Sequence, residues 1–413
     1  MALAGRRIVV TGLGAVSPLG LDVAANVAAA REGRGAIRVQ SFDLRPDGPD
    51  VCDFPAALVE GDVLGPLETA LGRRIGASLD PFALFAVAAT REALAQAQLI
   101  GHPALETRAA LILGHGFAGI HTLEANYARL FARKLPKTHP LTIPKAMVSA
   151  PVSAAAMMFG LHGPVFAVSS ACASSGHAIA QGAAMVQAGL VEIALVGGSE
   201  AIATPGSLRA WDGLQAMSPT ACRPFSAGRD GMAIGEGGAV LVLESLDHAL
   251  ARGATILAEY GGAGLTSDAF HWTQPSLEGP SSAMRAALDA ADLDPEAPLL
   301  ISAHGTGTPL NDKNEAAAIR TVLGDAVART PVIATKSAHG HLIGAAAALQ
   351  TVIALDALGA GLAPPILGYL APDPECDLDL VLGEARPVAA RALLVNAFAF
   401  GGLNACLVFK RWE

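Results

Sequence analysis

Charged side chains are scarce in this sequence, and one long stretch has none. Asp, Glu, Lys and Arg make up 16% of the 413 residues, whereas hydrophobic residues make up 52%. A chain of this length and composition can bury a large core, and its length suggests two or three units. The stretch between Lys145 and Glu192 carries no charge, but Pro151, Gly160 and Pro164 interrupt it. We therefore expect a buried central layer here and no membrane span.

Paired cysteines and a signal peptide are also missing. The five cysteines at positions 52, 172, 222, 376 and 406 have no paired spacing, which argues against a disulfide framework and a zinc site. Residues 5–12 place two arginines before a short apolar run that is too brief for a signal peptide and lacks a cleavage site. We expect a first strand here and a cytoplasmic protein.

Nucleotide and nucleic-acid signals are absent as well. The formal net charge of −9 argues against binding nucleic acid. Gly12 and Gly14 follow a predicted strand without the third glycine of a dinucleotide site, and residues 197–201 lack the final glycine of a hydrolase elbow. The sequence therefore supports neither a nucleotide cofactor nor a serine nucleophile.

Cys172 is the most informative residue that is present. It lies in residues 168–176, VSSACASSG, and the small-residue run 177–189 predicts a helix directly after it. Unpaired N–H groups and the helix dipole at a helix N-terminus favour a thiolate and can bind an oxyanion. The pattern indicates acyl transfer, although a lone cysteine in an apolar segment is more often an inert core residue.

Two histidines also lie at turns. His304 follows the apolar residues 298–301 at the start of a Gly-rich loop, and His341 precedes a second small-residue helix. Each alone is as readily structural as functional, but three turns that each deliver a reactive side chain indicate one catalytic site. The turns at 168–177 and 334–341 both open Ala-rich helices, which predicts two duplicated halves around a central layer.

Six ordered motifs resemble those of the β-ketoacyl synthases, the decarboxylating condensing enzymes of fatty-acid and polyketide assembly, in their elongating Cys-His-His class. The motifs occupy residues 9–20, 168–176, 223–237, 302–315, 335–341 and 396–404. The resemblance implies a thiolase-like α/β fold with five layers, α-β-α-β-α, built from two duplicated halves. We place the nucleophile in residues 1–248 and the two histidines and the lysine in residues 249–413, within one compact body.

The resemblance also implies a role for each site residue. Cys172 would accept the acyl group as a thioester, with its own N–H and that of Phe400 as the oxyanion hole. His304 and His341 would stabilise the enolate that malonyl thioester forms as it loses carbon dioxide. Lys336 would give electrostatic support, paired with Glu315, and the product would be a β-ketoacyl thioester two carbons longer.

Substrate-binding residues follow from the same resemblance. Thr306, Thr308 and Thr273 match contacts to a phosphopantetheine arm, although they can equally cap loops. The loop that holds Phe398 and Phe400 has alanine at position 399 where the family usually has glycine, and we expect this to restrict the loop. Phe117 matches a residue bordering the acyl tunnel, which predicts short or medium primers. Asp312 and Lys313 are interpreted as solvated loop residues.

The expected partner is an acyl carrier protein, which would bring the phosphopantetheine arm, so the protein itself needs no cofactor. Because the carrier is acidic, docking requires a local basic patch. The densest basic runs are Arg129, Arg133, Lys134 and Lys137, and Arg73 with Arg74, although ordinary solvated charge is an equal alternative.

Other functions remain possible for the same fold. We expect a homodimer, while an enzyme active only with a chain-length-factor-like subunit is the alternative. A degradative thiolase is disfavoured because Cys406 is followed by Leu407 rather than by that family's Cys-x-Gly turn. His339 and His341 lack nearby carboxylates, so no metal site is expected.

Overall fold

The computed structural model describes residues 5–43, 51–293 and 297–413. Its main sheet has the strand order β11-β10-β14-β15-β9-β1-β8-β6-β4-β5. The strands from the first half of the chain are β1 (Ile8–Val16), β4 (Ala109–Gly114), β5 (Val165–Val168), β6 (Ile193–Glu200) and β8 (Gly237–Ser245). Those from the second half are β9 (Ala258–Ser267), β10 (Leu299–Ser302), β11 (Val332–Ile333), β14 (Ala392–Ala399) and β15 (Leu403–Arg411).

The two halves repeat one topology. The order β5-β4-β6-β8-β1 matches β11-β10-β14-β15-β9, with the first three strands of each set parallel and the last two added antiparallel. A ladder of three residue pairs between β1 and β9 joins the two five-stranded sheets. The repeated order confirms the predicted duplication. The boundary placed after residue 248 falls within α10 (Leu246–Ala251), between β8 and β9.

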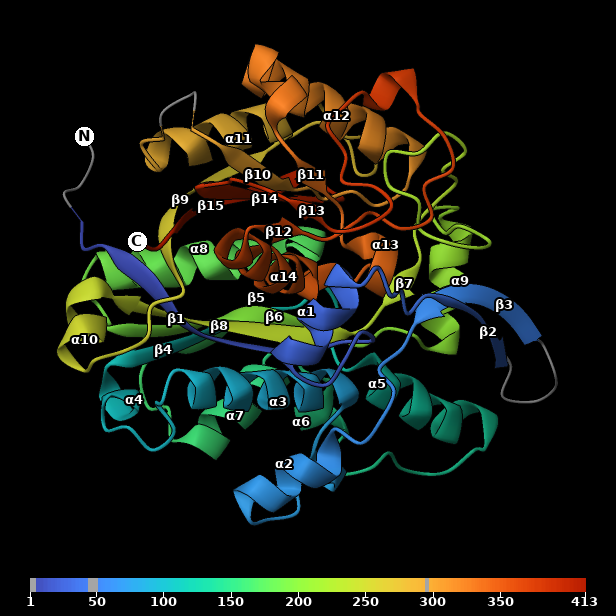
Figure 1. Ribbon diagram of the computed structural model, residues 1–413. Helices are drawn as coiled ribbons and strands as arrows, with labels where there is room; N and C mark the ends of the chain where they lie inside the picture. The colour runs from blue at the N-terminus through green and yellow to red at the C-terminus, as the bar shows by residue number, and fades with distance from the viewer. Residues whose placement is uncertain (1–4, 44–50, 294–296) are drawn as a thin grey trace.

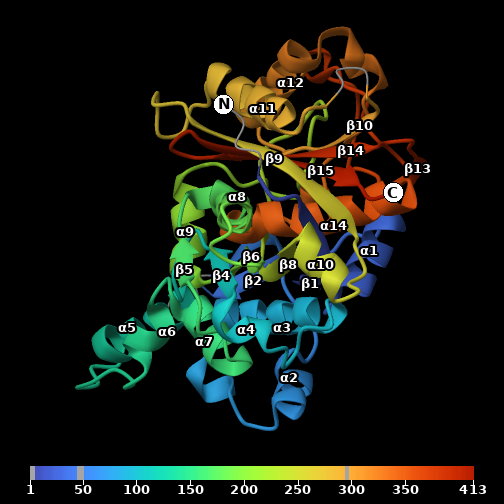
Figure 2. The ribbon, with the colours of Figure 1, turned by 90° about the vertical axis from the view of Figure 1, so that its left-hand side faces the viewer.

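Five layers are visible in Figures 1 and 2. The helices α8 (Ser174–Gln187) and α14 (Ala346–Ala360) lie between the two sheets. One outer face is covered by α3 (Pro81–Gln96) and α7 (Ala150–Phe159), and the other by α11 (Glu278–Ala290) and α12 (Pro309–Leu323). This is the predicted α-β-α-β-α architecture.

Small side chains allow α8 to lie between two sheets. A Cβ atom on Gly182 would lie 2.2 Å from a methyl group of Val196 in β6, and one on Gly176 would lie 3.0 Å from Ala405 in β15. The charge-free stretch therefore supplies a central helix, as expected. The strands beside it, such as β6, are buried along their whole length because helices cover both faces.

The second central helix is apolar for the same reason. Residues Ile343–Ala360 are long and apolar enough to cross a membrane, yet 83% of this window is buried inside the protein. Its composition thus suits the centre of a large core.

The remaining elements flank these layers. A small sheet contains β2 (Arg38–Asp43), β3 (Val51–Ala57) and β7 (Ile234–Gly235), and a strand pair contains β12 (Leu362–Ala363) and β13 (Arg386–Pro387). The other helices are α1 (Val23–Arg31), α2 (Leu64–Leu71), α4 (Ala104–Thr107), α5 (Ile120–Tyr127), α6 (Thr142–Ala146), α9 (Pro205–Gly213) and α13 (Lys336–His339).

Candidate active site

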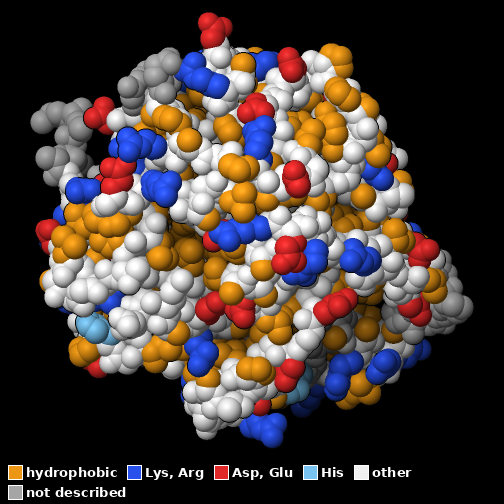
Figure 3. Space-filling view, in the orientation of Figure 1, with side chains coloured by type: hydrophobic (Ala, Val, Ile, Leu, Met, Phe, Trp, Pro, Cys, Tyr) orange, Lys and Arg blue, Asp and Glu red, His pale blue; other side chains and the backbone are white. Residues whose placement is uncertain are grey.

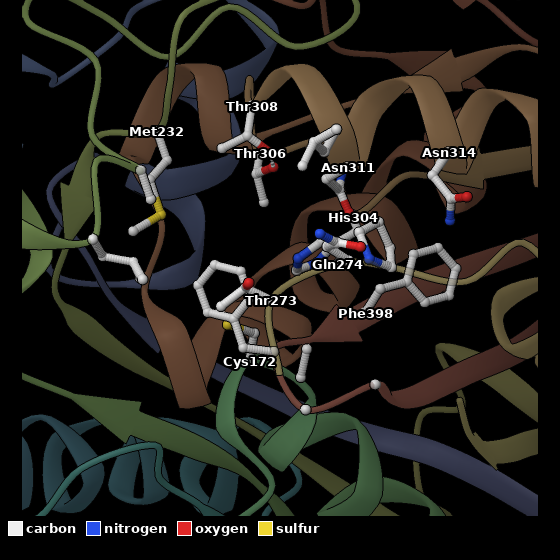
Figure 4. Close-up of a pocket in the computed structure, with 18 of the residues that line it drawn as sticks. Cys172, Met232, Thr273, Gln274, His304, Thr306, Thr308, Asn311, Asn314 and Phe398 are labelled. Atoms are coloured by element: carbon white, nitrogen blue, oxygen red, sulfur yellow. Dashed lines mark hydrogen bonds between the residues drawn. The ribbon is translucent and has the colours of Figure 1, made fainter. Parts of the chain in front are cut away.

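One pocket of about 380 Å³ gathers most of the site residues predicted from the sequence. Its lining includes Cys172, Thr273, His304, Thr306, Thr308, His341, Phe398 and Phe400. Figure 4 shows Thr306 and Thr308 at the upper end of the pocket, Cys172 at the lower end and His304 between them. The two halves of the chain therefore contribute to the same cavity.

The turn that carries Cys172 has a strained backbone. Cys172 lies in a 3-10 turn, Ala171–Ala173, that leads into α8, and Ala171 has a φ of 49°. The second half repeats this geometry at Ile343–Ala345, where Ile343 has a φ of 44° and α14 follows. Positive φ is costly for a non-glycine residue and is often found at functional sites. The turn that matches the Cys172 turn is therefore 343–345, further along the chain than the segment 334–341 compared above.

A buried carboxyl group joins the turn at Ile343–Ala345 to the segment that follows β4. Glu200 accepts the N–H of Gly116 at 2.6 Å and that of Gly344 at 3.1 Å. A Cβ atom on Gly344 would lie only 2.2 Å from the nitrogen of Gly116, so this approach requires glycine. Burial raises the pKa of Glu200 to about 8. Sequence reasoning missed Glu200, although an acidic residue ending an apolar strand was a usable signal.

The Cys172 sulfur lies among hydrogen-bond donors but is buried. The backbone N–H groups of Phe400 and of Cys172 itself favour the charged form of the sulfur. Burial raises the pKa of the thiol to about 11 and outweighs the charge of Lys336 and these N–H groups, which lower it. The expectation of a favoured thiolate is therefore wrong, because desolvation exceeds the effect of the helix N-terminus.

The two histidines face each other as neutral rings. Their centroids are 5.4 Å apart with planes at 82°. Burial, and then the charge of Lys336, lower the pKa of both His304 and His341 well below 6.5. Nδ1 of His341 accepts the N–H of Ile343 at 3.1 Å, and Nδ1 of His304 lies 3.4 Å from the Lys336 ammonium, which can only donate. Each ring therefore carries its proton on Nε2.

Lys336 and Glu315 do not form the expected ion pair among the described residues. The ammonium of Lys336 donates to the carbonyl of His304 at 2.5 Å and to the amide oxygen of Gln350. The Glu315 carboxylate instead accepts the N–H groups of His304 at 2.7 Å and Gly305 at 2.8 Å. Lys336 thus binds the carbonyl of His304, and Glu315 binds its N–H. Gln350 was missed, although a lone amide in an apolar helix is a signal for a buried hydrogen-bonding role.

Asp312 is buried, contrary to the prediction of a solvated loop residue. Its carboxylate accepts the N–H groups of Phe225 at 2.8 Å, Thr306 at 3.1 Å and Gly307 at 3.1 Å. The loop is thereby held so that the hydroxyl groups of Thr306 and Thr308 lie 2.8 Å apart in the pocket. Lys313 is exposed as predicted, but it lies in α12 rather than in a loop and forms an ion pair with Glu375.

Phe117 does not line the pocket, whereas Trp211 does. The ring of Trp211 contacts Phe117 edge-on at 6.3 Å and stacks on Phe400 at 6.3 Å. Trp211, Ile202 and Met232 share one apolar cluster with Cys172. Sequence reasoning missed Trp211, because spacing alone does not show which apolar side chains meet across the fold.

The backbone at position 399 does not need glycine. In the loop after β14, Gly401 and Gly402 have positive φ, at 82° and 72°. Ala399, the last residue of β14, does not. The expected penalty for alanine is therefore absent in this conformation of the loop.

His339 is held by polar groups of its own half. Its Nδ1 lies 2.7 Å from the carbonyl of Gly340 and its Nε2 lies 3.0 Å from the Thr335 hydroxyl. Within the described ranges, no group of three His, Cys, Asp or Glu side chains could hold a metal ion. All five cysteines are free thiols.

The longer basic run is exposed beyond α5. Arg129, Arg133, Lys134 and Lys137 are all exposed, and Figure 2 shows this part of the chain projecting from the body. Figure 3 shows Lys and Arg side chains gathered at the lower right of the molecule, where Figure 1 draws the end of α5. Arg73 and Arg74 are also exposed, at the end of α2.

Comparisons with known proteins cover the whole architecture. Residues 5–249 match the family model described as Beta-ketoacyl synthase, N-terminal domain, and residues 257–370 match its C-terminal domain. Nodulation protein E of Rhizobium meliloti is 41% identical over 98% of this chain and 99% of its own length. 3-Oxoacyl-[acyl-carrier-protein] synthase 2 of Staphylococcus aureus is 34% identical over 99% of both chains. The solved structure of the ishigamide ketosynthase/chain length factor superposes with a TM-score of 0.92 at 33% identity, covering 99% of this chain and 100% of that one.

Proposed function

The chain belongs to the β-ketoacyl synthase family and is a ketosynthase, and on that premise we propose that it is an acyltransferase that extends a carrier-bound acyl group by two carbons. One observation carries the proposal: a buried cysteine shares its pocket with two neutral histidines whose protons both lie on Nε2. This combination offers a nucleophile and two donors for a developing negative charge. Residues 1–248 would supply the nucleophile, and residues 249–413 the donors.

In the first half-reaction, the Cys172 sulfur attacks the carbonyl carbon of an acyl thioester on the carrier. The N–H groups of Cys172 and Phe400 stabilise the oxyanion that forms. The carbon–sulfur bond to the pantetheine arm then breaks, and the thiol proton of Cys172 ends on the departing pantetheine sulfur. The result is an acyl thioester on Cys172 and a free carrier.

In the second half-reaction, a malonyl thioester enters and loses its terminal carboxylate as carbon dioxide. The electron pair left behind forms an enolate, whose oxygen accepts the Nε2–H groups of His304 and His341. Since both rings are neutral, they stabilise this charge as donors and do not need to release a proton. The enolate carbon attacks the acyl carbonyl, the bond from this carbon to the Cys172 sulfur breaks, and the thiolate takes up a proton from solvent.

The pantetheine arm would enter beside the threonines. The hydroxyl groups of Thr306 and Thr308 at one end of the pocket, with Thr273, suit hydrogen bonding to the amides of such an arm. The protein then needs no cofactor of its own, because the arm arrives with the carrier.

The primer is proposed to be short or medium in length. Trp211 supports this proposal better than Phe117, because Trp211 packs in the Cys172 cluster and stacks on Phe400. A tryptophan beside the nucleophile occupies volume that a long acyl chain would need.

An acidic acyl carrier protein is the proposed partner, in the cytoplasm. The exposed basic run after α5 would offset the net charge of −9 at the docking surface. The name of the S. aureus relative, which includes the acyl carrier protein, supports this choice.

A second candidate is an enzyme active only as a heterodimer. The likeness to the ishigamide ketosynthase/chain length factor favours this alternative to a homodimer. It shares the same chemistry at Cys172 and differs in requiring a related subunit.

Intact-protein mass spectrometry separates these possibilities. The protein is incubated with carrier-bound acyl primers of two to sixteen carbons and then with malonyl carrier, with Cys172→Ala as the control. An adduct on the wild type alone, discharged by malonyl carrier as an elongated product, supports the ketosynthase acting by itself. Acylation that appears only with a chain-length-factor-like subunit supports the heterodimer, and no adduct under either condition contradicts the proposal.

A further inference from the structure

Within the part of the chain that the structure describes, a buried lysine in this site is held only by neutral acceptors. The Lys336 ammonium is fully buried and contacts the carbonyl of His304 and the amide oxygen of Gln350. Among the ion pairs of the described residues, none involves Lys336. A buried cation without a contacting carboxylate is unusual, because burial normally requires charge pairing.

Gln350 is oriented by its other contacts. Its Nε2 group donates to the carbonyl of Ala303 at 3.1 Å and to that of Asn396 at 3.3 Å. Two carbonyl acceptors can be satisfied only by the NH₂ end of the amide, so the oxygen end must face Lys336. Gln350 is fully buried in α14 and therefore links the lysine to β14 and to the residue that follows β10.

Acidic groups lie further from the lysine. Burial lowers the pKa of Lys336 to about 8, while the carboxylates Glu315 and Asp312 on α12 and the thiols Cys172 and Cys222 oppose this shift.

The positive charge in turn acts on groups from several elements. It lowers the pKa of the Cys172 thiol and of the imidazoles of His304, His341 and His339. The ammonium thus influences the nucleophile and both donors at once.

We propose that Gln350 is a positioning residue that holds Lys336 through a neutral amide, so that the charge of the ammonium acts on the Cys172 thiol and the His304 ring without a contacting counter-charge. A glutamate of nearly the same shape would keep the contact but neutralise the lysine locally. The inference rests on the proposed function, since it takes Cys172 as the nucleophile.

Alkylation of Cys172 by iodoacetamide tests this without any carrier protein. The rate is followed by intact mass on the full-length protein between about pH 6 and 10, with Cys172→Ala to subtract other thiols. In the wild type the rate should rise less steeply above about pH 8, where Lys336 loses its proton. In Gln350→Glu the added carboxylate keeps Lys336 protonated to higher pH, so this change of slope should move to higher pH. The rate at neutral pH should fall about tenfold, which corresponds to a rise of one unit in the pKa of Cys172.

Matched variants distinguish the loss of positioning by Gln350 from a general destabilisation of the protein. Gln181→Glu adds the same charge on an exposed part of α8 and should keep the wild-type profile. Gln350→Met removes the acceptor without adding charge, so the change of slope should move to lower pH. Lys336→Met should abolish it. If Gln350→Glu does not fold, Gln350→Met decides the question.

Three outcomes would overturn the inference. Profiles of Gln350→Glu and Gln350→Met that superimpose on the wild type would remove the role of Gln350. A change of slope that persists in Lys336→Met would show that Lys336 does not cause it. A wild-type Cys172 that is never alkylated would overturn both the nucleophile and the inference, whereas normal alkylation without acyl transfer would overturn only the proposed function.

Discussion

The indole of Trp211 stacks on the phenyl ring of Phe400, with centroids 6.3 Å apart and planes inclined by 28°. The backbone N–H of Phe400 also lowers the pKa of the Cys172 thiol and belongs to the proposed oxyanion hole, so the stack connects the apolar cluster to this hole. The space available to an acyl chain and the geometry of acyl transfer therefore depend on the same contact.

Trp211→Leu should widen the primer range. The smaller side chain frees volume next to Cys172, and each methylene that a pocket newly admits changes discrimination by about 1–3 kcal/mol. We expect acylation by primers two to four carbons longer than the wild type accepts to rise by about tenfold or more, measured by intact mass. Trp412→Leu, at the C-terminal end, is the matched control. An unchanged primer profile in Trp211→Leu would contradict a role for this ring in chain length.

His341→Ala should separate the two half-reactions. Acylation of Cys172 does not use the His341 donor in the proposed mechanism, so the acyl adduct should form at a near wild-type rate. Loss of one donor to the enolate should slow discharge by malonyl carrier about 10²–10³-fold. Both rates are read from the same mass series. Equal losses in acylation and discharge would show that His341 does not act selectively on the malonyl step.

Arg252→Met should destabilise the protein in a pH-dependent way. Burial raises the pKa of Glu244, but hydrogen bonds from Arg252 at 2.5 and 2.8 Å, together with Thr11 and His248, outweigh it and lower this pKa below 4.5. The carboxylate therefore contributes stability above pH 4.5, and this contribution is lost as the pH falls through the folded-state pKa. At pH 7 the variant should lose about 3 kcal/mol of unfolding free energy because a buried charge loses its partner.

The pH series of denaturant unfolding supplies the test of this ion pair. The difference between wild type and Arg252→Met should shrink as the pH falls below 4.5. Arg34→Met breaks an exposed pair with Glu32 and should cost less than about 1 kcal/mol at any pH. A constant difference across the pH range would contradict the assignment of the effect to Glu244.

Reversing the charge of the basic run should weaken binding of the acyl carrier protein. In Arg133→Glu with Lys134→Glu, we expect the KM for acyl carrier to rise about tenfold at low salt and the defect to shrink at high salt, because exposed charges are screened. The kcat should stay close to the wild-type value. Arg34→Glu changes charge elsewhere on the surface and serves as the control. A defect of equal size in both proteins would argue against docking at this run.

The sequence allowed the fold and most of the pocket to be predicted because turns recur at strand ends. Cys172, His304 and His341 each follow an apolar run, and residues after buried strands gather at one place in an α/β fold. Small-residue helices likewise indicated the central layer, since only small side chains fit between two close sheets.

The contacts between these segments could not be predicted in the same way. The family resemblance implied that Lys336 pairs with Glu315, but backbone groups of His304 contact both residues. The burial of Asp312 depends on three N–H groups that converge from two separate segments. The thiol of Cys172 has a raised pKa because it is desolvated, and local sequence does not show how much protein covers a side chain.

The hydrogen bond between Glu200 and Gly344 joins residues 144 positions apart in the chain. During synthesis, a chain that ends before the second half carries Cys172 but has no histidine pair beside it. Since domains tend to fold as they emerge, the thiol spends this time without the donors needed to decarboxylate malonyl thioester. A chain that ends before residue 304 therefore cannot consume malonyl thioester by the proposed mechanism, because both histidine donors lie later in the sequence.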